Sequence, residues 1–437
     1  MNRRISPAII FVWLGALLWT SQARARVVVS IRRALGVLIS AAGILVLGGL
    51  ASGDTVGGNL LWEDIFQVNV INSISFVETE GKRVFAAGIT DTDDPVNVPY
   101  FIVRAHNAKT GTLVWETALG SFNELLAAFA VEEGRVFAAG SQGPLFGCHA
   151  CLFSLIVRAY DAATGRVLWE DGLGTCFNQP DCRPSDQAEA LSATGLAADE
   201  GRVFVGGSQF AFRSGSSTAL VRAYDAATGN LLWENNRPAE SPLFLGSRGG
   251  RVFAVTTVYD STNHPLTLPL RAYDASSGEQ FWEVTLPNGT SVFAVGPNKV
   301  FVAGSGFIRA YNAATGELLW NTSSASPRQL AVGRERLFAV GDTISAYDAS
   351  TGDLLWADDR SSNLVTVHGA HVFAASGFLV RAYDADNGAF LWENYQATAM
   401  PATANAVTAG GGRVFVGGEQ SRRPRHSEWI LRAYDIK

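Results

Sequence analysis

The chain has 437 residues, which at about 150 residues per domain suggests three domains. Charged residues make up 17% and hydrophobic residues 47% of the total, a balance that excludes disorder. The formal net charge is −6, but six Arg and no acid lie in the first 50 residues, so the rest of the chain is more acidic than the total. An acidic body argues against a nucleic-acid binder, whose contact face would be basic.

Two apolar stretches within residues 1–55 predict a targeting or anchoring segment. Residues 7–20 follow a pair of Arg and precede a small-x-small pattern at 23–25, which is typical of a signal peptide. Residues 34–52 are uncharged and long enough to span a bilayer. Either a signal peptide precedes a membrane anchor, or the true start lies near Arg32 and residues 34–52 are the signal. Both alternatives place residues 56–437 outside the cytoplasm: in the periplasm, at the cell surface or secreted.

From residue 60 onward, two short phrases alternate along the chain. The first reads Arg-Ala-Tyr-Asp-Ala-Ala-Thr-Gly-x-x-Leu-Trp-Glu at 158–170 and 222–234, with weaker copies elsewhere. The second, Arg-Val-Phe-x-x-Gly, precedes it, as at 83–88, 135–140 and 202–207. Eight copies of each phrase occur. A repeat of this kind predicts one structural unit stacked many times rather than three domains.

Each repeat predicts a four-stranded antiparallel unit. The Val-Phe and Ala-Tyr runs are typical of strands, and Asp-Ala-Ala-Thr-Gly is typical of a tight turn before the Trp strand. The repeat Trp lie 36 to 64 residues apart, which is the period of a β-propeller blade.

The two ends of the repeat region predict how the ring closes. Trp62 has no Tyr-Asp phrase before it, and Tyr434 has no Trp phrase after it. The N-terminal strand is therefore expected to complete the last blade. The predicted fold is all-β: an eight-bladed β-propeller of four-stranded antiparallel blades over residues 56–437.

The phrase at 159–169 resembles the tryptophan-docking repeat of the PQQ-like (pyrroloquinoline-quinone) β-propeller superfamily, and the resemblance extends over residues 60–437. It implies that the repeat Trp pack between adjacent blades. These structural positions are Trp62, Trp115, Trp169, Trp233, Trp282, Trp320, Trp356 and Trp392.

The superfamily contains PQQ-dependent dehydrogenases and non-catalytic propellers, and the resemblance implies the non-catalytic branch. The dehydrogenases typically carry a Cys-Cys pair over the cofactor, and this chain has no Cys-Cys dipeptide. No catalytic, cofactor-binding or metal-binding residue is therefore expected. PQQ with Ca²⁺ would be needed only under the alternative that the chain is a dehydrogenase.

All four Cys lie in the predicted second blade, at Cys148, Cys151, Cys176 and Cys182. An even, clustered set outside the cytoplasm predicts disulfides, with pairing between the two loops favoured. A Cys₄ zinc site is the alternative.

The connection between the second and third strands is predicted to be long in blades one, two, three, four and eight. Its bounds are 89–100, 141–154, 208–218, 256–267 and 419–429, and blades five to seven have only short turns there. Because these five blades are consecutive in a closed ring, the loops form a crescent on one face. The predicted partner contacts on this crescent are Tyr100, Phe146, Phe210, Phe212, Arg213, Tyr259, Arg422, Arg423, Arg425 and Trp429.

The predicted function is an exported, non-catalytic scaffold that binds a protein or a cell-surface component through this crescent. The N-terminal segment would contact the membrane if it is not cleaved. The alternatives are a PQQ-dependent dehydrogenase and a carbohydrate-binding or surface-layer protein.

Overall fold

The computed structural model describes residues 57–66, 71–91, 100–118, 123–143, 154–174, 189–211, 215–260, 264–324, 326–396, 398, 401–423 and 426–437. Contacts divide the chain into units of residues 1–54 and 55–437, and the first unit, with the predicted targeting segment, lies outside the described residues. In the described part of the chain, no helix is long and apolar enough to cross a membrane.

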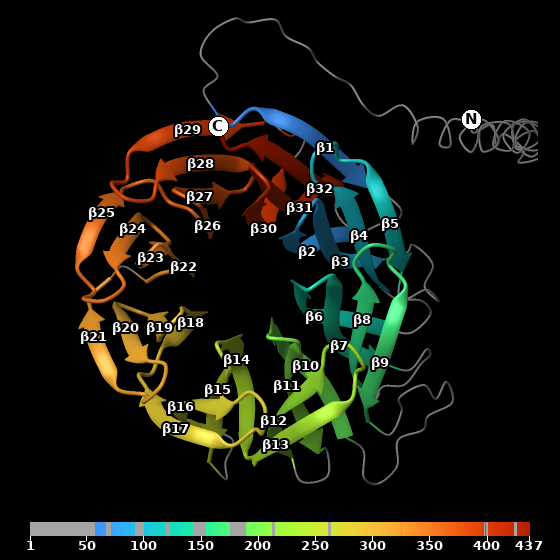
Figure 1. Cartoon of the computed structure of the whole chain (residues 1–437), viewed down its shortest axis with the longest axis vertical. Coiled ribbons are helices and arrows are strands. Elements are labelled where there is room, and N and C mark those ends of the chain that lie inside the picture. Colours follow the sequence, from blue (N-terminus) through green and yellow to red (C-terminus); the bar gives the residue numbers. More distant parts are fainter. Residues whose placement is uncertain are drawn as a thin grey trace, which may run out of the picture. The chain divides into compact units, whose positions relative to one another are not determined.

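The described residues form eight four-stranded antiparallel sheets that stand around one axis (Figure 1). Blades one to four are made of β2 (Ile71–Glu80), β3 (Arg83–Asp91), β4 (Tyr100–Asn107), β5 (Leu113–Ala118); β6 (Asn123–Glu132), β7 (Arg135–Gly143), β8 (Ser154–Asp161), β9 (Val167–Leu173); β10 (Glu189–Asp199), β11 (Arg202–Ala211), β12 (Ser216–Asp225), β13 (Leu231–Pro238); and β14 (Glu240–Arg248), β15 (Arg251–Tyr259), β16 (Pro265–Asp274), β17 (Gln280–Leu286).

Blades five to eight are made of β18 (Thr290–Val295), β19 (Lys299–Gly304), β20 (Phe307–Asn312), β21 (Leu318–Thr322); β22 (Gln329–Gly333), β23 (Arg336–Val340), β24 (Ile344–Asp348), β25 (Leu354–Asp358); β26 (Leu364–His368), β27 (His371–Ser376), β28 (Leu379–Asp384), β29 (Phe390–Tyr395); and β30 (Ala402–Gly410), β31 (Arg413–Arg423), β32 (His426–Asp435), β1 (Leu60–Phe66). The predicted eight-bladed fold is confirmed, including completion of the last blade by the N-terminal strand.

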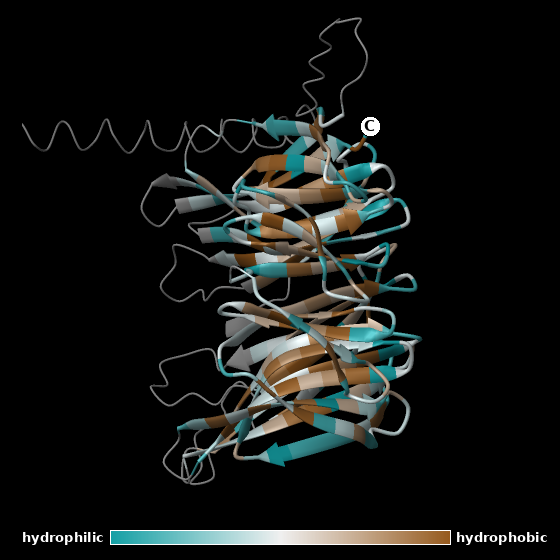
Figure 2. Ribbon diagram, turned by 90° about the vertical axis from the view of Figure 1, so that its left-hand side faces the viewer, coloured by the Kyte–Doolittle hydropathy of each residue, from teal (hydrophilic) through white to brown (hydrophobic). Residues whose placement is uncertain are grey.

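The hydrophobic core lies between blades rather than within them. The Phe of the second phrase and the Tyr of the first are fully buried, as at Phe137 and Tyr160, and each apolar cluster draws its residues from two neighbouring blades. Figure 2 shows apolar residues within the stacked strands and hydrophilic residues at many of the turns. A blade therefore buries its faces only when a neighbour stands on each side.

The turn before the Trp strand is built by its Asp, as predicted, and Asn107 and Asn312 take the same role in blades one and five. Asp161 Oδ1 accepts hydrogen bonds from Ala163 N at 3.0 Å and from Thr164 N at 2.8 Å. Gly165 takes the left-handed conformation at φ 73°. The hydrogen bond from Thr164 lowers the pKa of Asp161, because it stabilises the carboxylate.

Each repeat Trp contacts that turn in the next blade. The Trp115 indole Nε1 donates to the carbonyl of Ala162 at 3.0 Å, and its ring lies where a Cβ on Gly165 would project. The remaining donor–acceptor pairs across the blade boundaries are Trp62–Ala108, Trp169–Ala226, Trp233–Ala275, Trp282–Ala313, Trp320–Ala349, Trp356–Ala385 and Trp392–Ile436.

The eighth turn is assembled from the two ends of the propeller. Gly58 N donates to Asp435 O at 2.8 Å and Asp435 N donates to Asn59 O at 3.0 Å, as Gly165 and Asp161 do within one continuous turn. Gly58 has φ 87°, and a Cβ there would meet Trp392. Residues 57–59 thus take the place that the Thr-Gly segment holds in a continuous turn.

One buried histidine lies at this closing seam. His106, in β4, occupies the Tyr position of the repeat and is 1% exposed. Its Nε2 lies 3.7 Å from Asp64 Oδ2 of β1, and Asp64 also accepts from Arg104 at 2.5 Å. At the equivalent place in blade three, the Tyr224 hydroxyl donates to Asp171 at 2.8 Å. Burial lowers the pKa of His106, and Arg104 lowers it further against the opposing effects of Asp64 and the Gly111 carbonyl.

We predict that Gly229→Ala destabilises the protein more than Gly201→Ala. Both residues have positive φ, 75° and 73°, so the backbone strain of an alanine is matched. A Cβ on Gly229 would clash with the Trp169 ring, whereas nothing lies within 4 Å of a Cβ on Gly201. Overpacking of this kind costs about 1–3 kcal/mol. Urea unfolding followed by tryptophan fluorescence measures the difference, and equal midpoints for the two variants would contradict the prediction.

We predict that His106→Tyr removes a loss of stability at acid pH. Because the pKa of His106 is lowered in the fold, the unfolded chain binds a proton first as pH falls below about 6.5, and the free energy of unfolding falls by at most about 1.4 kcal/mol per pH unit. The tyrosine does not titrate in this range.

The measurement is urea unfolding of both proteins at pH 7.5 and pH 5. Burial raises the pKa of Glu78 to about 7, so Glu78 makes the opposite contribution. Its effect is to increase the free energy of unfolding as pH falls. It is common to both proteins, so the difference between them isolates His106. The same pH dependence in both proteins would show that His106 does not set it.

Candidate functional site

The blades differ in height on the face where the second strand connects to the third. The second strands of blades one, two, three, four and eight have 9, 9, 10, 9 and 11 residues. Those of blades five, six and seven have 6, 5 and 6 residues. At about 3.4 Å per residue, the tall hairpins rise roughly 10–20 Å above the short ones. We call the face carried by these five consecutive blades the tall face.

Most of what was predicted as loop in blades three, four and eight is paired strand. Ser208–Ala211 pair with Ser216–Ala219 in blade three, and Glu419 to Ser421 pair with Ser427 to Trp429 in blade eight. This corrects the predicted bounds of these loops. The strands continue past the glycine that ends the second phrase because their partner strands remain aligned beside them.

The predicted partner contacts are distributed unevenly over the described structure. Phe210 in β11 and Tyr259 in β15 are half-buried on the extended hairpins. Tyr100 begins β4, and Arg422 and Arg423 end β31, but their side chains lie outside the described residues. Also outside the described residues are Phe146, Phe212, Arg213, Arg425, Cys148, Cys151, Cys176 and Cys182.

Trp429 is removed from the set of predicted contacts. It lies within β32, is 1% exposed, and its indole Nε1 donates to the carbonyl of Ile89 in blade one at 3.1 Å. Phe66 packs against its ring at 5.8 Å between centroids. The side chain is core between blades eight and one, because the strand that carries it is paired on both sides.

A buried polar cluster fixes the tall hairpin of blade eight against blade one. Asn72 is fully buried; its backbone N–H and side-chain amide donate to Ser427 Oγ and Ser427 O, both at 2.8 Å. The Thr90 hydroxyl donates to Asn72 Oδ1 at 2.7 Å. Because each of these bonds is buried, the relative position of the two hairpins is well specified.

A second buried cluster supports the tall hairpin of blade four. Arg271 binds both carboxylate oxygens of Glu240, at 2.6 and 2.8 Å, and donates to Glu283 at 2.7 Å. The Thr256 hydroxyl donates to Glu240 at 2.5 Å. Glu240 follows Ala239, which has a positive φ of 61°, and it occurs outside both repeat phrases. Sequence reasoning therefore gave no signal for this cluster.

Sequence reasoning also missed an exposed apolar residue on the tall face. Leu266 lies at the tip of the β15–β16 hairpin and is 55% exposed. The available signal was its place inside a long connection, but only aromatic and Arg residues were considered as contacts there.

The innermost strands carry small residues at one common level around the axis. The residues paired with the Phe of the second phrase are Glu78, Ala130, Ala197, Gly246, Ala294, Ala331, Thr366 and Thr408. Glu78 is the one carboxylate of this set. Part of the Glu78 side chain is accessible to solvent. The protein packed around it nevertheless limits hydration of the carboxylate, and this raises the pKa of Glu78 to about 7.

This level does not fit a Ca²⁺–PQQ group. Calcium takes six to eight oxygen ligands, and Glu78 is accompanied here by alanines, a glycine and two threonines. The Asn405 amide of β30, which lies outside this level, already donates to Ser73 Oγ and the carbonyl of Ile74. Across the described residues, no group of three or more His, Cys, Asp or Glu is placed to hold a metal ion.

Comparisons with solved structures show the same fold in proteins of different kinds. The chain is similar to the computationally designed Ika8 protein, with a TM-score of 0.57, 15% identity, and coverage of 83% of this chain and 96% of that one. BamB from Moraxella catarrhalis has a TM-score of 0.52 and 13% identity, and the match covers 86% of this chain and 98% of BamB. The quinohemoprotein alcohol dehydrogenase ADHIIG from Pseudomonas putida HK5 has a TM-score of 0.56 and 14% identity. The match covers 87% of this chain and 76% of the dehydrogenase.

Comparison with the curated proteins finds no match. A family model, described as outer membrane protein assembly factor BamB, matches residues 154–266 and 269–423, which is more than half of the chain. The matched region begins in blade two and ends in blade eight, and it includes consecutive copies of the Trp-containing repeat. The chain belongs to this family of PQQ-like repeat β-propellers.

Proposed function

We propose that this protein is a non-catalytic scaffold that binds a protein partner on the tall face. The observation that carries the proposal is the height difference. Five consecutive blades have second strands of 9 to 11 residues, and three have 5 or 6. Extension of paired strands on a rigid ring provides a stable, raised surface, which is what a docking scaffold requires.

The family supports a protein partner and an extracytoplasmic location. Its model is described as an assembly factor for outer membrane proteins, which is a role in association rather than in chemistry. The acidic body and the apolar N-terminal segment agree with export. Disulfides among the four cysteines of blade two would then brace the tall face, and this pairing is part of the proposal.

A PQQ-dependent dehydrogenase is the alternative with the same fold, as the similarity to the quinohemoprotein alcohol dehydrogenase illustrates. The residues at the common level around the axis weigh against it, because Glu78 alone among them offers a carboxylate. The proposal therefore includes no cofactor.

We predict that a photocrosslinker on the tall face captures a specific partner and that one on the short blades does not. Benzoylphenylalanine replaces Leu266 in the full chain, and the matched control replaces Asp342, whose side chain is 79% exposed on the same face in blade six. After irradiation of cells of the native organism, mass spectrometry identifies the adducts. We expect one protein to crosslink from position 266, to be absent at position 342, and to be displaced by excess unlabelled chain.

Two results would count against this function. Adducts of equal identity and yield at both positions would show that the tall face is not selective. Alcohol oxidation in a dye-linked assay, after incubation of the purified chain with PQQ and Ca²⁺, would contradict the non-catalytic assignment.

A further inference from the structure

A pocket opens where the ring steps down from blade eight to blade seven. Its volume is about 560 Å³, within the range of roughly 300–1,000 Å³ typical of small-molecule sites. Blade seven connects its second and third strands through a turn of only two residues, Gly377 and Phe378, beside the 11-residue strand β31 of blade eight. The short turn leaves space above blade seven, and this space is bounded by the end of β29, by residues of the connection to blade eight and by Ala402 at the start of β30.

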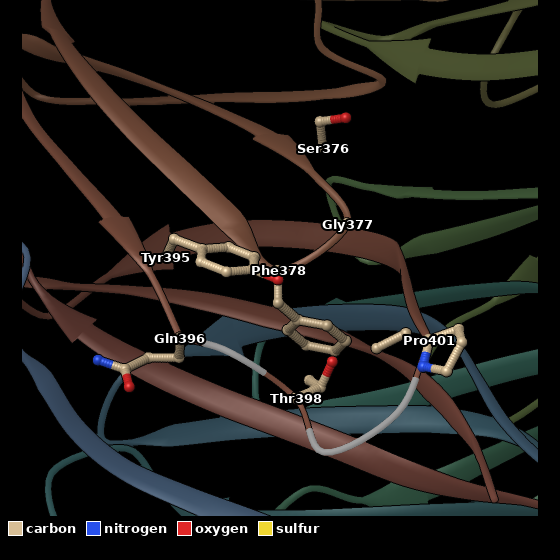
Figure 3. Close-up of a pocket in the computed structure, with 8 residues that line it drawn as sticks. Ser376, Gly377, Phe378, Tyr395, Gln396, Thr398 and Pro401 are labelled. Atoms are coloured by element: carbon tan, nitrogen blue, oxygen red, sulfur yellow. The ribbon is translucent and has the colours of Figure 1, made fainter.

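The lining combines one exposed aromatic ring with uncharged hydrogen-bonding groups. Tyr395, at the end of β29, is 66% exposed, the largest exposed fraction among the large hydrophobic residues of the described structure. Ser376, Gln396 and Thr398 supply hydroxyl and amide groups, and Phe378 and Pro401 supply apolar surface. Figure 3 shows Tyr395, Phe378, Thr398 and Pro401 close together, with Ser376 above them and the Gln396 amide extending to the other side of the Gln396 backbone.

The floor of the pocket is held in place from blade eight. The Arg432 guanidinium lies 4.8 Å from the centroid of the Phe378 ring, and its Nη1 donates to the carbonyl of Gln396 at 3.0 Å. Arg432 Nε also lies 2.5 Å from a Glu63 carboxylate oxygen, so the Glu63 carboxylate balances the positive charge of Arg432 beneath the pocket. Phe378 is 3% exposed, whereas Tyr395 projects outward, so the pocket has a rigid base and an accessible aromatic rim.

The chemistry of the lining selects a neutral, polyhydroxylated ligand. Among the described residues that line the pocket there is no Asp, Glu, Lys, Arg or His, so an ionic ligand would find no counter-charge in this lining. Hydroxyl and amide groups both donate and accept hydrogen bonds, as the hydroxyls of a sugar do. The exposed tyrosine ring offers a flat apolar surface for the C–H face of a pyranose. We propose that this pocket binds a neutral hexopyranose, either free or as a unit of a glycan chain.

The proposal is tested by saturation-transfer NMR on the full chain. The probes are methyl α-glucopyranoside, methyl α-mannopyranoside and methyl β-galactopyranoside, with glucuronate as the charged comparison. We expect saturable binding of at least one neutral hexoside, no binding of glucuronate, and affinity weakened about tenfold or more by Tyr395→Ala or Gln396→Ala. Tyr395→Phe keeps the ring and is expected to retain most of the affinity.

The matched control is Leu354→Ala, which removes a 58% exposed side chain from the outer strand of blade six, away from the pocket. Because Tyr395 is largely exposed, its variant is expected to keep the wild-type urea midpoint, which separates loss of binding from loss of fold. A tetrasaccharide of the bound hexose that binds more tightly than the methyl glycoside supports a glycan source, and equal affinity supports a free sugar.

Three results would overturn the assignment. One is absence of saturable hexoside binding; another is hexoside binding that Tyr395→Ala and Gln396→Ala leave unchanged. The third is Tyr395-dependent binding of the neutral dipeptide acetyl-Phe-Pro-amide in place of every hexoside, which would make the pocket a peptide site. The inference does not depend on the protein partner, so crosslinking at position 266 can succeed or fail independently of it.

Discussion

The contact between each repeat tryptophan and the glycine turn of the next blade is the interaction on which the ring depends. The indole satisfies its N–H on a backbone carbonyl of that turn, and its ring covers a glycine that has no Cβ to keep it away. The same turn is closed from within by its own aspartate. A local turn and a boundary between blades are thus one structure, so a blade without its neighbour loses both its packing and the cover of its turn.

The fold could be predicted from the sequence because its determinants are local and repeated. The turn at Asp161–Gly165 and the strands on either side are encoded by the residues that form them, and the unmatched phrases at Trp62 and Tyr434 indicated the closure. The height of the tall hairpins was harder to predict. The second phrase ends at a glycine, but strand pairing continues beyond it wherever the partner strand remains in register.

The candidate site could be predicted only as a region. The five long connections identified the tall face, but single residues there depend on neighbours distant in sequence. Trp429 was expected to be exposed and is buried, because Ile89 of blade one accepts its N–H. Glu240 gave no signal, because its partner Arg271 has an ordinary repeat position and the pair forms only once β14 and β16 have both paired with β15. Asn72 and Glu240, which lie outside both repeat phrases, make buried hydrogen bonds that hold hairpins of the tall face in position.

The split eighth turn has a consequence for how the chain folds. Arg432 pairs with Glu63 across 369 residues of sequence, while the corresponding Arg and Glu of a continuous blade are 12 residues apart. The first seven blades can form in order as short-range hairpins, but β1 has no strand beside it until the C-terminal strand is made. Closure is therefore the step of highest contact order and largest loop entropy, and the open ring that precedes it exposes the edge of β32 and the inner faces of its two end blades. Pairing of β1 with β32 converts a stack of blades with two free ends into a ring with none.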